Sequence, residues 1–451
     1  MPHDPARKKM IRAHLKEQED SAGGRERLPE EKLIVKGKPE RTPVYKLSVD
    51  DLAFNKANGR IKAEVLEKET ELGRSLKPES PDDQQLIKTI LLSIRKDENE
   101  KIREDLRKNG QMRPGIITCD GIVINGNRRK ALLEDLYRET GETKYKYLDA
   151  QVLPSDITKA ELWLIEAGIQ MSTPQQLDYS PINNLLNWRD GVLGGLTVED
   201  MAARIYGVSK ENIESDLDRL KLIDEYLADF LGKPERYYLV RALNEHFIDL
   251  QDILAWARRP RGNVPMNWKP TASDLNELKL VGFYYIRTKF PHLRIRELRD
   301  LFVTAESWTE AKKALDLDVE SPTEKSGTET TEVSPITELD AEEGDVGAED
   351  TAFTTSVEEQ DIQEEIAWRT KYEGTLKNFY ENAKEQKQII KDSQRPLALA
   401  ARALKMLRAI PTQKAQLSEP ELDDVLRDVV STTNTLRKII QKNTRRNGRS
   451  K

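Results

Sequence analysis

Residues 120 to 132 constrain the fold of this chain more than any other stretch, because they combine a strand, a turn and the start of a helix. The apolar, β-branched run 121–124 predicts a short buried strand. Asn125-Gly126-Asn127 is a turn signal, since Gly126 can adopt backbone angles that are closed to other residues. Apolar residues then recur at helical spacing over 130–137. The pattern predicts a strand that turns sharply into a helix.

Two arginines, Arg128 and Arg129, stand where this helix begins. Free backbone N–H groups at a helix start favour anions, and guanidinium groups bind phosphate oxygens in pairs. The segment therefore fits a phosphate site. An ordinary strand-to-helix turn with two solvated arginines is the alternative reading of the same spacing.

Length and composition limit the kinds of protein that this chain can be. The chain has 451 residues, enough for two or three domains, and its 34% charged content indicates some unfolded or elongated helical sequence. The single cysteine, Cys119, excludes an internal disulfide and a cysteine-rich zinc site, and the four histidines are scattered. No apolar run approaches the roughly 20 residues that span a bilayer. We expect a cytoplasmic protein without a membrane partner.

The pattern along the chain predicts an α+β protein. A small α/β domain comes first, then a mostly helical domain, then a helical C-terminal module tethered by a linker. The linker is acidic and rich in Ser, Thr and Gly, and it lacks the apolar residues needed to fold. The expected parts are a disordered charged arm (1–30), the α/β domain (31–156), the helical domain (157–317), the linker (318–360), the helical module (361–442) and a basic tail (443–451).

Residues 197–222 predict a helix-turn-helix. Thr197 with Asp200 forms an acidic capping box, Gly207 ends the first helix, and Ser209 caps the second. The exposed face of the second helix is largely acidic, so a purely structural helix pair is the alternative. The candidate DNA-contacting residues are Lys210, Asn212, Ser215 and Arg219 on the second helix, and Arg258, Arg259 and Arg261 beyond it.

The C-terminal module has the pattern of an interaction element. Helical patterns over 362–391 and 397–410 precede a third helix, whose capping box is Ser418 with Glu421. An apolar stripe on the third helix would be buried in a three-helix hairpin, a coiled-coil homodimer or a complex with another protein. The stripe comprises Leu422, Val425, Leu426, Val429, Leu436 and Ile440.

The order of these elements resembles the ParB/sulfiredoxin superfamily over roughly 44–227. Its first box, a helix, a Gly-x-x-x-Pro turn and a strand, is matched by a predicted helix at 99–108, Gly110 to Pro114 and a strand at 115–118. The Gly126 turn with its arginines is similar to the second box. The stretch 166–170 resembles the third box, and 178–182 resembles the segment that comes after that box in ParB. The helix-turn-helix is next in the chain, as in ParB.

The resemblance implies a nucleotide switch associated with DNA. ParB-type proteins bind CTP with Mg²⁺, engage DNA at the nucleoid and form homodimers. Carried over to this sequence, the phosphate-binding residues are Gly126, Asn127, Arg128 and Arg129, with Arg113 of the first box beside them. Glu166 stands where the metal-binding acid is expected.

Departures from the family pattern leave other functions open. The third box lacks its Asn, since Ala167 or Gly168 stands there, and Met171 replaces its Arg, which puts cytidine specificity and slow NTP hydrolysis in doubt. Sulfinic acid reduction needs a cysteine where Asn127 stands. A nuclease on the same fold would need an acidic metal cluster, and an adaptor without nucleotide is the second alternative. The candidate acids for the nuclease are Asp120, Glu134, Asp135 and Glu166.

Overall fold

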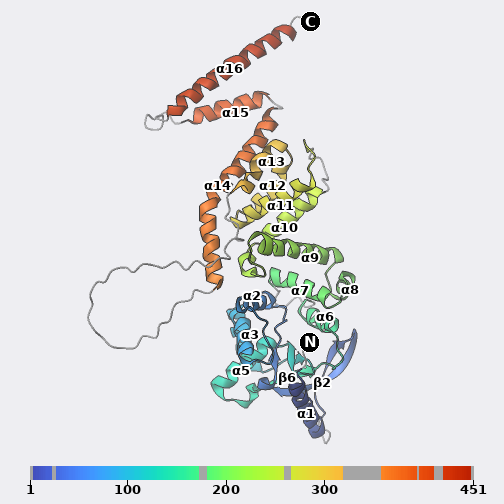
Figure 1. Cartoon of the computed structure of the whole chain (residues 1–451). Helices are drawn as coiled ribbons and strands as arrows, with labels where there is room; N and C mark the ends of the chain where they lie inside the picture. Colours follow the sequence, from blue (N-terminus) through green and yellow to red (C-terminus); the bar gives the residue numbers. More distant parts are fainter. Residues whose placement is uncertain are drawn as a thin grey trace, which may run out of the picture. The chain divides into compact units, whose positions relative to one another are not determined.

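The computed structural model describes residues 4–22, 27–171, 180–258, 266–317, 357–393, 396–410 and 420–447. The chain is α+β, as expected: one mixed sheet lies in the N-terminal region, and helices make up most of the rest (Figure 1). Two compact units divide it, residues 1–380 and residues 381–451. The sequence predicted boundaries at 156 and 317 instead.

The sheet has the strand order β1-β2-β6-β4-β5-β3. Strands β3 and β5 are parallel, as are β4 and β6, and the other neighbours are antiparallel. The parallel β3–β5 pair matters most for function because both strands end at the same edge. The strands are β1 (Glu30–Val35), β2 (Lys38–Ser48), β3 (Ala53–Phe54), β4 (Gly115–Ile117), β5 (Ile122–Asn125) and β6 (Tyr147–Val152).

Helices cover both faces of this sheet. One core joins α5 to the sheet through Leu132, Leu133 and Leu136, and a second packs strand residues against Leu162 and Ile165 from the following helix, α6. The helix predicted after the Gly126 turn is therefore confirmed. The elements concerned are η1 (Val49–Asp51), α2 (Lys62–Leu72), α3 (Pro81–Ser93), α4 (Lys96–Asn109), α5 (Asn127–Thr140), η2 (Thr143–Tyr145) and α6 (Lys159–Met171).

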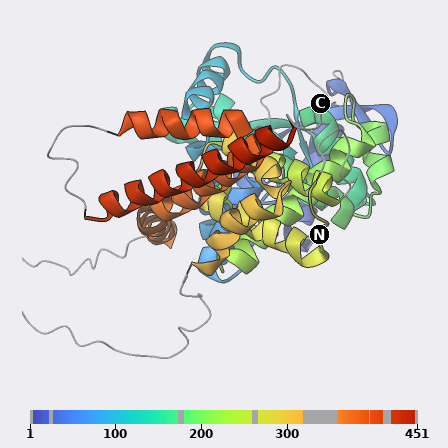
Figure 2. The same ribbon diagram turned by 90° about the horizontal axis from the view of Figure 1, so that it is seen from above.

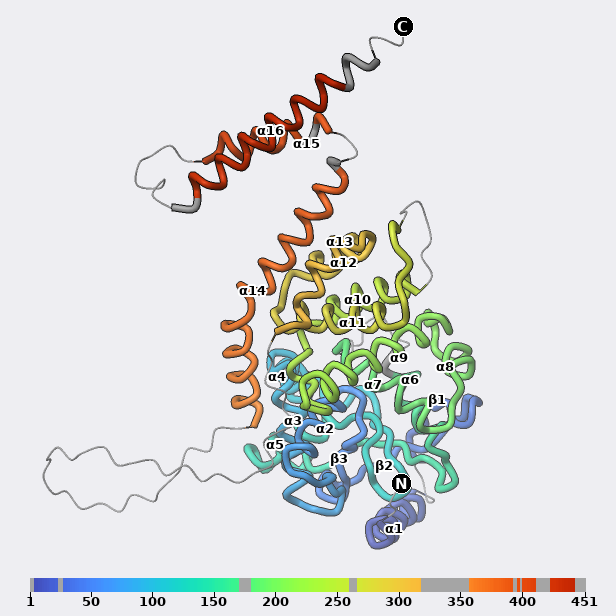
Figure 3. Tube along the Cα trace, turned by 45° about the horizontal axis from the view of Figure 1, so that its top comes forward, coloured from blue at the N-terminus to red at the C-terminus, as the bar shows by residue number. Residues whose placement is uncertain are grey.

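The N-terminal segment corrects the prediction of a disordered arm. Helix α1 (Pro5–Ala22) lies against β2 (Figure 3), with Ile11 fully buried in the sheet's core. Arg7 Nε donates to the carbonyl oxygen of Asp120 at 2.6 Å, and Gln18 bonds the backbone of Lys46 twice. These long-range contacts order a helix whose own sequence is too polar to predict it.

The next region is helical, as predicted for 157–317. Its core contains aromatic side chains from several helices, among them Phe247, Phe283 and Trp308. The elements are α7 (Pro181–Leu193), α8 (Val198–Arg204), α9 (Lys210–Glu225), η3 (Tyr226–Phe230), η4 (Tyr237–Val240), α10 (Asn244–Arg258), α11 (Ala272–Arg287), α12 (His292–Phe302), α13 (Ala305–Ala311) and η5 (Lys312–Asp316).

The two helices predicted at 197–222 are present as α8 and α9. Thr197 and Asp200 form the capping box, and the Ser209 side chain accepts from the backbone N–H of Asn212. Helix α8 ends earlier than expected, at Arg204, and Gly207 lies in the turn with a φ of +81°. Ile213 is fully buried, so α9 presents the expected apolar face to the core.

The C-terminal helices differ in part from a single tethered module. The first half of α14 (Val357–Ser393) packs on α11 and α12 within the 1–380 unit (Figure 1). Asp361 is buried and pairs with Lys233 at 2.9 Å and with Arg236, while Glu365 binds Arg287 bidentately at 2.8 and 2.9 Å. Charge pairing with distant residues therefore attaches this half of the helix. Most of the predicted linker lies outside the described residues, but its last four residues open α14.

The 381–451 unit contains the end of α14, α15 (Pro396–Ala409) and α16 (Pro420–Asn447), and Figure 2 shows α15 and α16 as separate helices. Helix α15 begins at Pro396, one residue before the start of the second helical pattern predicted at 397–410. The basic tail predicted from 443 is helical up to Asn447. Ser418 of the predicted capping box lies outside the described residues.

Removal of the Asp361 carboxylate should destabilise the 1–380 unit. The substitution Asp361→Ala leaves Lys233 and Arg236 without their buried partner, which costs about 3 kcal/mol. Urea unfolding followed by tryptophan fluorescence measures the change. Glu373→Ala, at an exposed position of the same helix, is the matched control. Equal unfolding midpoints for the two variants would contradict the attachment of α14.

Candidate functional site

Two similar turns meet at one edge of the sheet. Strand β3 is followed by Asn58-Gly59-Arg60 and then α2, and β5 ends in Asn125-Gly126 before α5. Since β3 and β5 pair in parallel, both turns leave the sheet at their carboxyl ends. Ligands in open α/β sheets bind at such edges. The topology therefore places two Asn-Gly turns side by side, with Arg60 directly after the first and Arg128 two residues after Gly126 of the second.

Gly126 makes the second turn possible. Its φ is +109°, a backbone conformation that other residues rarely adopt, so a larger residue would be strained there although a Cβ would make only ordinary contacts. No side chain caps the start of α5. The first N–H groups of this helix and its positive dipole end are thus available to an anion.

Asn127 has a different role from the one expected. Its side chain is buried, with Oδ1 accepting from the backbone N–H of Asn55 at 3.0 Å and Nδ2 donating to the carbonyl of Val123 at 2.7 Å. Both hydrogen-bonding groups of the amide are therefore used within the fold. The side chain holds the β3 turn against β5, and only the backbone of Asn127 can face an anion.

Four arginines line one cavity of about 400 Å³ at this edge: Arg60, Arg113, Arg128 and Arg129. Burial, together with the nearby charge of Arg60, lowers the pKa of the Arg128 guanidinium. Burial also lowers the pKa of Arg129, with Arg113 adding to the effect. The positive charges of these arginines therefore lie close together where little water reaches them. Such a site favours a bound anion, because the negative charge of the anion offsets their mutual repulsion.

Acidic side chains compensate Arg128 and Arg129 in part, since Glu98 raises the pKa of Arg128, and Asp149 and Asp105, the latter in the lining of the same cavity, raise that of Arg129. Arg128 Nη1 lies 3.5 Å from Glu98, beyond ordinary hydrogen-bond length, and Arg129 donates to the carbonyl oxygen of Arg113. The predicted residues Gly126, Arg113, Arg128 and Arg129 are thus brought together. An anion with several oxygens would complete their hydrogen bonds.

A second cavity, of about 570 Å³, adjoins the first through Arg113, Asn125 and Arg129. Its lining includes Leu33, Ile116 and Ile165, and it extends along the β1–β2 hairpin and α6. The same lining includes Lys32, Lys36 and Arg204, so an apolar wall faces several cations, and the two cavities together fit a ligand with a planar, weakly polar part and an anionic part.

Glu166, the predicted metal-binding acid, contacts the first Asn-Gly turn. Its Oε1 accepts from the backbone N–H of Gly59 at 3.0 Å, and burial raises the pKa of this carboxyl to about 7. The described part of the chain contains no group of three His, Cys, Asp or Glu side chains that could hold a metal ion. A metal here would therefore need ligand oxygens from a bound phosphate, with Glu166 as a single protein carboxylate.

The helical region fastens the segment that carries Arg60. Asn183 of α7 accepts from the backbone N–H of Ala63 at 2.8 Å and donates to the carbonyl of Arg60 at 3.0 Å. Glu166 of α6 adds its bond to Gly59. Sequence reasoning missed Arg60 and Asn183. The repeat of Asn-Gly plus a cation after two apolar strands is the signal that could have revealed Arg60.

The predicted DNA contacts are not equally available. Lys210 pairs with Glu199 and Glu214, and Arg219 pairs with Asp216. The backbone carbonyl of Ser215 accepts a hydrogen bond from the side chain of Gln251 at 2.8 Å. Asn212 and Arg258 are exposed. Arg259 and Arg261 lie outside the described residues. Two of the cations predicted to contact DNA phosphates, Lys210 and Arg219, are therefore already paired with acidic side chains of the same chain.

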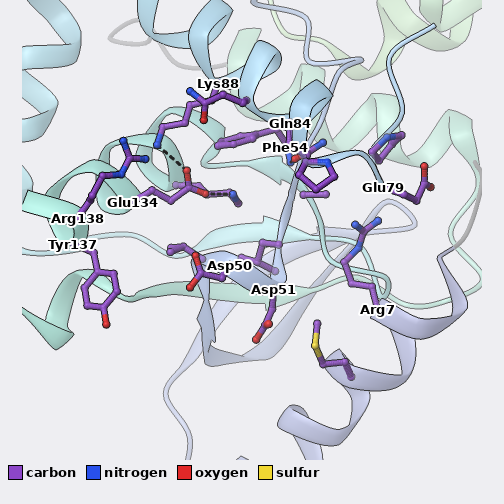
Figure 4. A pocket seen from close by; sticks show the side chains of 18 of the residues that line it. Arg7, Asp50, Asp51, Phe54, Glu79, Gln84, Lys88, Glu134, Tyr137 and Arg138 are labelled. Atoms are coloured by element: carbon purple, nitrogen blue, oxygen red, sulfur yellow. Dashed lines mark hydrogen bonds and ion pairs between the residues drawn. The ribbon is translucent and has the colours of Figure 1, made fainter. Parts of the chain in front are cut away.

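The opposite face of α5 holds a balanced ion cluster beside a cavity of about 810 Å³. Lys88 lies 2.9 Å from Glu134 (Figure 4) and 2.8 Å from Asp135, and Lys130 pairs with Glu134 over the ring of Phe54. Two of the acids proposed for a nuclease, Glu134 and Asp135, are thus engaged by lysines. Asp120 accepts from the hydroxyl of Thr118 in the turn before β5.

No protein-family model and no curated protein matches this chain. Among the helices that the structure describes, none is long and apolar enough to cross a membrane.

The stability of the protein should depend on the Glu166 carboxyl. Its pKa is raised from 4.5 to about 7, so its contribution is complete below pH 4.5 and is lost as the pH rises through 7. The rise corresponds to at most about 3 kcal/mol. Glu166→Gln keeps an acceptor for Gly59 and should flatten this loss, measured as unfolding midpoints between pH 5 and 8. Glu100→Gln, on an exposed part of α4, should match the wild-type profile; a parallel Glu166→Gln profile would contradict the assignment.

Proposed function

We propose that this chain is a ParB-like, DNA-associated protein that binds a nucleoside triphosphate, CTP above all, at the edge formed by β3 and β5. Binding would change how the helical region engages DNA or a second copy of the chain. The resemblance of the sequence boxes suggests the nucleotide, and the site geometry supports the phosphate part.

The observation that carries the proposal is the convergence of Arg60, Arg113, Arg128 and Arg129 on one cavity beside the uncapped start of α5. Three linked phosphates present many acceptor oxygens and several negative charges. Paired guanidinium donors and helix N–H groups are the groups that bind them most strongly.

The adjoining apolar cavity supports a nucleoside rather than inorganic phosphate alone. Arg113, Asn125 and Arg129 border both cavities, so a ligand that contacts them can place phosphates on one side and a base on the other. Gln151 lines that side too, but it is buried and its amide nitrogen already donates to Glu31 and Thr42, so polar contacts to a base edge would come from Lys32, Lys36 and Arg204.

Mg²⁺ belongs to the proposal as a companion of the phosphates. One carboxylate plus phosphate oxygens and waters is a usual set of ligands for this ion. Glu166 is the proposed carboxylate, and its ionisation would strengthen both its attraction for Mg²⁺ and the hydrogen bond that it accepts from Gly59. We also expect slow hydrolysis of the bound nucleotide.

Loss of the arginines should abolish nucleotide binding without unfolding the protein. Arg128→Ala with Arg129→Ala removes two partly buried charges that intramolecular acids compensate only in part, so stability should change little while affinity for CTP falls at least tenfold. Calorimetric titration with CTP, ATP and GTP, each with and without Mg²⁺, measures the affinity and identifies the base. Arg138→Ala, an exposed position on the same helix, is the matched control.

Arg60→Ala tests the arginine that the sequence pattern did not reveal, and it should weaken binding to a similar degree. Equal affinities in the wild type and in the Arg128/Arg129 variant would refute the site. Unchanged affinity in Arg60→Ala alone would limit the site to the α5 side.

DNA binding should show a steep dependence on salt. Each phosphate contact changes the slope of log affinity against log salt by about 0.9. Arg258 is exposed, so Arg258→Ala should lower this slope by about one contact in a fluorescence-anisotropy titration with duplex DNA. Lys221, which pairs with Asp218 at 2.9 Å, supplies the control Lys221→Ala, which should leave the slope unchanged. A slope that no variant alters would argue against DNA contact at this end of α10.

An adaptor function is the second candidate. The pairing of Lys210 and Arg219 with acids on or beside α9 favours it, because a helix that reads DNA needs free cations or amides. In that case neither nucleotide nor DNA would bind in the two titrations above.

A further inference from the structure

Three cavities follow one another along the sheet edge. The cavity of about 570 Å³ meets the arginine-lined cavity of about 400 Å³ through Arg113, Asn125 and Arg129. The arginine-lined cavity in turn meets a third, of about 50 Å³, through Arg60 and Arg128. Among the residues that the structure describes, the first and the third cavities have no lining residue in common. The arginine-lined cavity therefore lies between the other two.

The third cavity, called the small cavity below, has the size and charge for a single phosphate group. A water molecule takes up roughly 30 Å³ in the liquid, so a cavity of about 50 Å³ admits one small group and excludes a base or a sugar. Its described lining contains one carboxylate, Glu64, and three arginines: Arg60, Arg95 and Arg128. The carboxylate is already engaged, because its Oε2 accepts from Asn183 at 3.2 Å and its Oε1 lies 3.8 Å from Arg241.

Arg95 stands directly before α4 in a backbone conformation that glycine adopts far more readily than arginine. Its φ is +53° and its ψ is +57°, and its side chain makes no capping bond to the helix. Such strained residues persist where the surrounding structure holds them, and they are frequent at ligand sites. The backbone strain at Arg95 thus falls on a residue that lines the small cavity.

One carboxylate holds two of the three guanidinium groups together. Glu98, in the first turn of α4, lies 3.2 Å from Arg95 and 3.5 Å from Arg128. Burial lowers the pKa of Arg128 most, and the charges of Arg60 and Arg95 lower it further against the opposing effect of Glu98. The positive charges around the small cavity therefore repel one another, and a bound anion would relieve that repulsion.

We propose that the small cavity receives the terminal phosphate of a nucleoside triphosphate and that Arg95 selects the triphosphate over the diphosphate. The base then lies in the cavity of about 570 Å³, and the inner phosphates contact Arg128, Arg129 and the start of α5. The last phosphate reaches the small cavity between Arg60 and Arg95. A diphosphate is one group shorter and lacks this contact, in which guanidinium donors would form charge-assisted hydrogen bonds.

This inference rests on the proposed function, because it assigns one part of the proposed ligand to one part of the same site. Calorimetric titration of the full chain with CTP and CDP tests it, and ATP with ADP and GTP with GDP are further pairs. The wild type should bind the triphosphate of the preferred base about tenfold more tightly than the diphosphate, or better, as expected for hydrogen bonds between charged groups.

Arg95→Gly should remove this preference and leave the fold intact. Glycine tolerates the positive φ, so the substitution takes away the guanidinium group without adding backbone strain. The affinity for the triphosphate should fall to about that for the diphosphate, and the affinity for the diphosphate should stay close to the wild-type value. A residue with only a structural role would weaken both nucleotides equally.

Arg107→Ala is the matched control, because Arg107 is an exposed arginine of the same helix and lines none of the three cavities. It should bind both nucleotides as the wild type does. Equal affinities of the wild type for triphosphate and diphosphate, or an equal loss for both in Arg95→Gly, would overturn the inference and leave the proposed function standing. A chain that binds no nucleotide at all would refute the proposed function and this inference together.

Discussion

The buried amide of Asn127 holds the candidate site together. It accepts from the backbone of Asn55 and donates to the carbonyl of Val123, so the turns after β3 and β5 are fixed to each other. A buried amide with satisfied donors and acceptors specifies one geometry, because any shift leaves a polar group unpaired. Arg60 and Arg128 can converge only because these turns are joined. The side chain of the residue that the family resemblance assigns to phosphate thus has a structural task, and Arg60 of the neighbouring turn lines the same cavity.

The two faces of α5 differ in how far their positively charged side chains are paired with carboxylates. On one face, Lys88 and Lys130 share Glu134, and Asp135 adds a second carboxylate to Lys88, so positive and negative charges balance. On the other face, Arg128 has Glu98 at 3.5 Å, and Arg129 has the carbonyl oxygen of Arg113 and the longer-range charges of Asp149 and Asp105. A buried charge is costly unless it is paired. The first face is therefore explained by the fold, whereas the second gathers guanidinium groups around a cavity that fits an anion.

The structural features that the sequence predicts correctly are those that depend on residues close together in the chain. The strand, the Gly126 turn and α5 result from local apolar spacing and from one conformational requirement, and the caps at Thr197 and Ser209 result from side chains that bond backbone a few residues away. Helix α1 and the attachment of α14 could not be predicted in this way. Ile11 is one apolar residue in a charged segment, and Asp361 finds Lys233 and Arg236 more than a hundred residues away. The pairing of Lys210 and Arg219 with acids likewise depends on rotamers that spacing does not determine.

Helix α7 gives the proposed switch a physical route. At its start, Asn183 bonds the backbone of Arg60 and Ala63, and one turn further along, Trp188 donates through Nε1 to Asp216 of α9 at 3.0 Å. Trp188 also packs against Trp163 of α6 in a core that includes Met201 and Ile213. A helix moves largely as a rigid body, because its hydrogen bonds resist bending. If an anion draws Arg60 into the cavity, the displacement of its backbone must either break the bonds to Asn183 or shift α7, and a shift of α7 carries Asp216 and the exposed face of α9 with it. The same few hydrogen bonds that order the site in the absence of a ligand therefore join it to the helix pair.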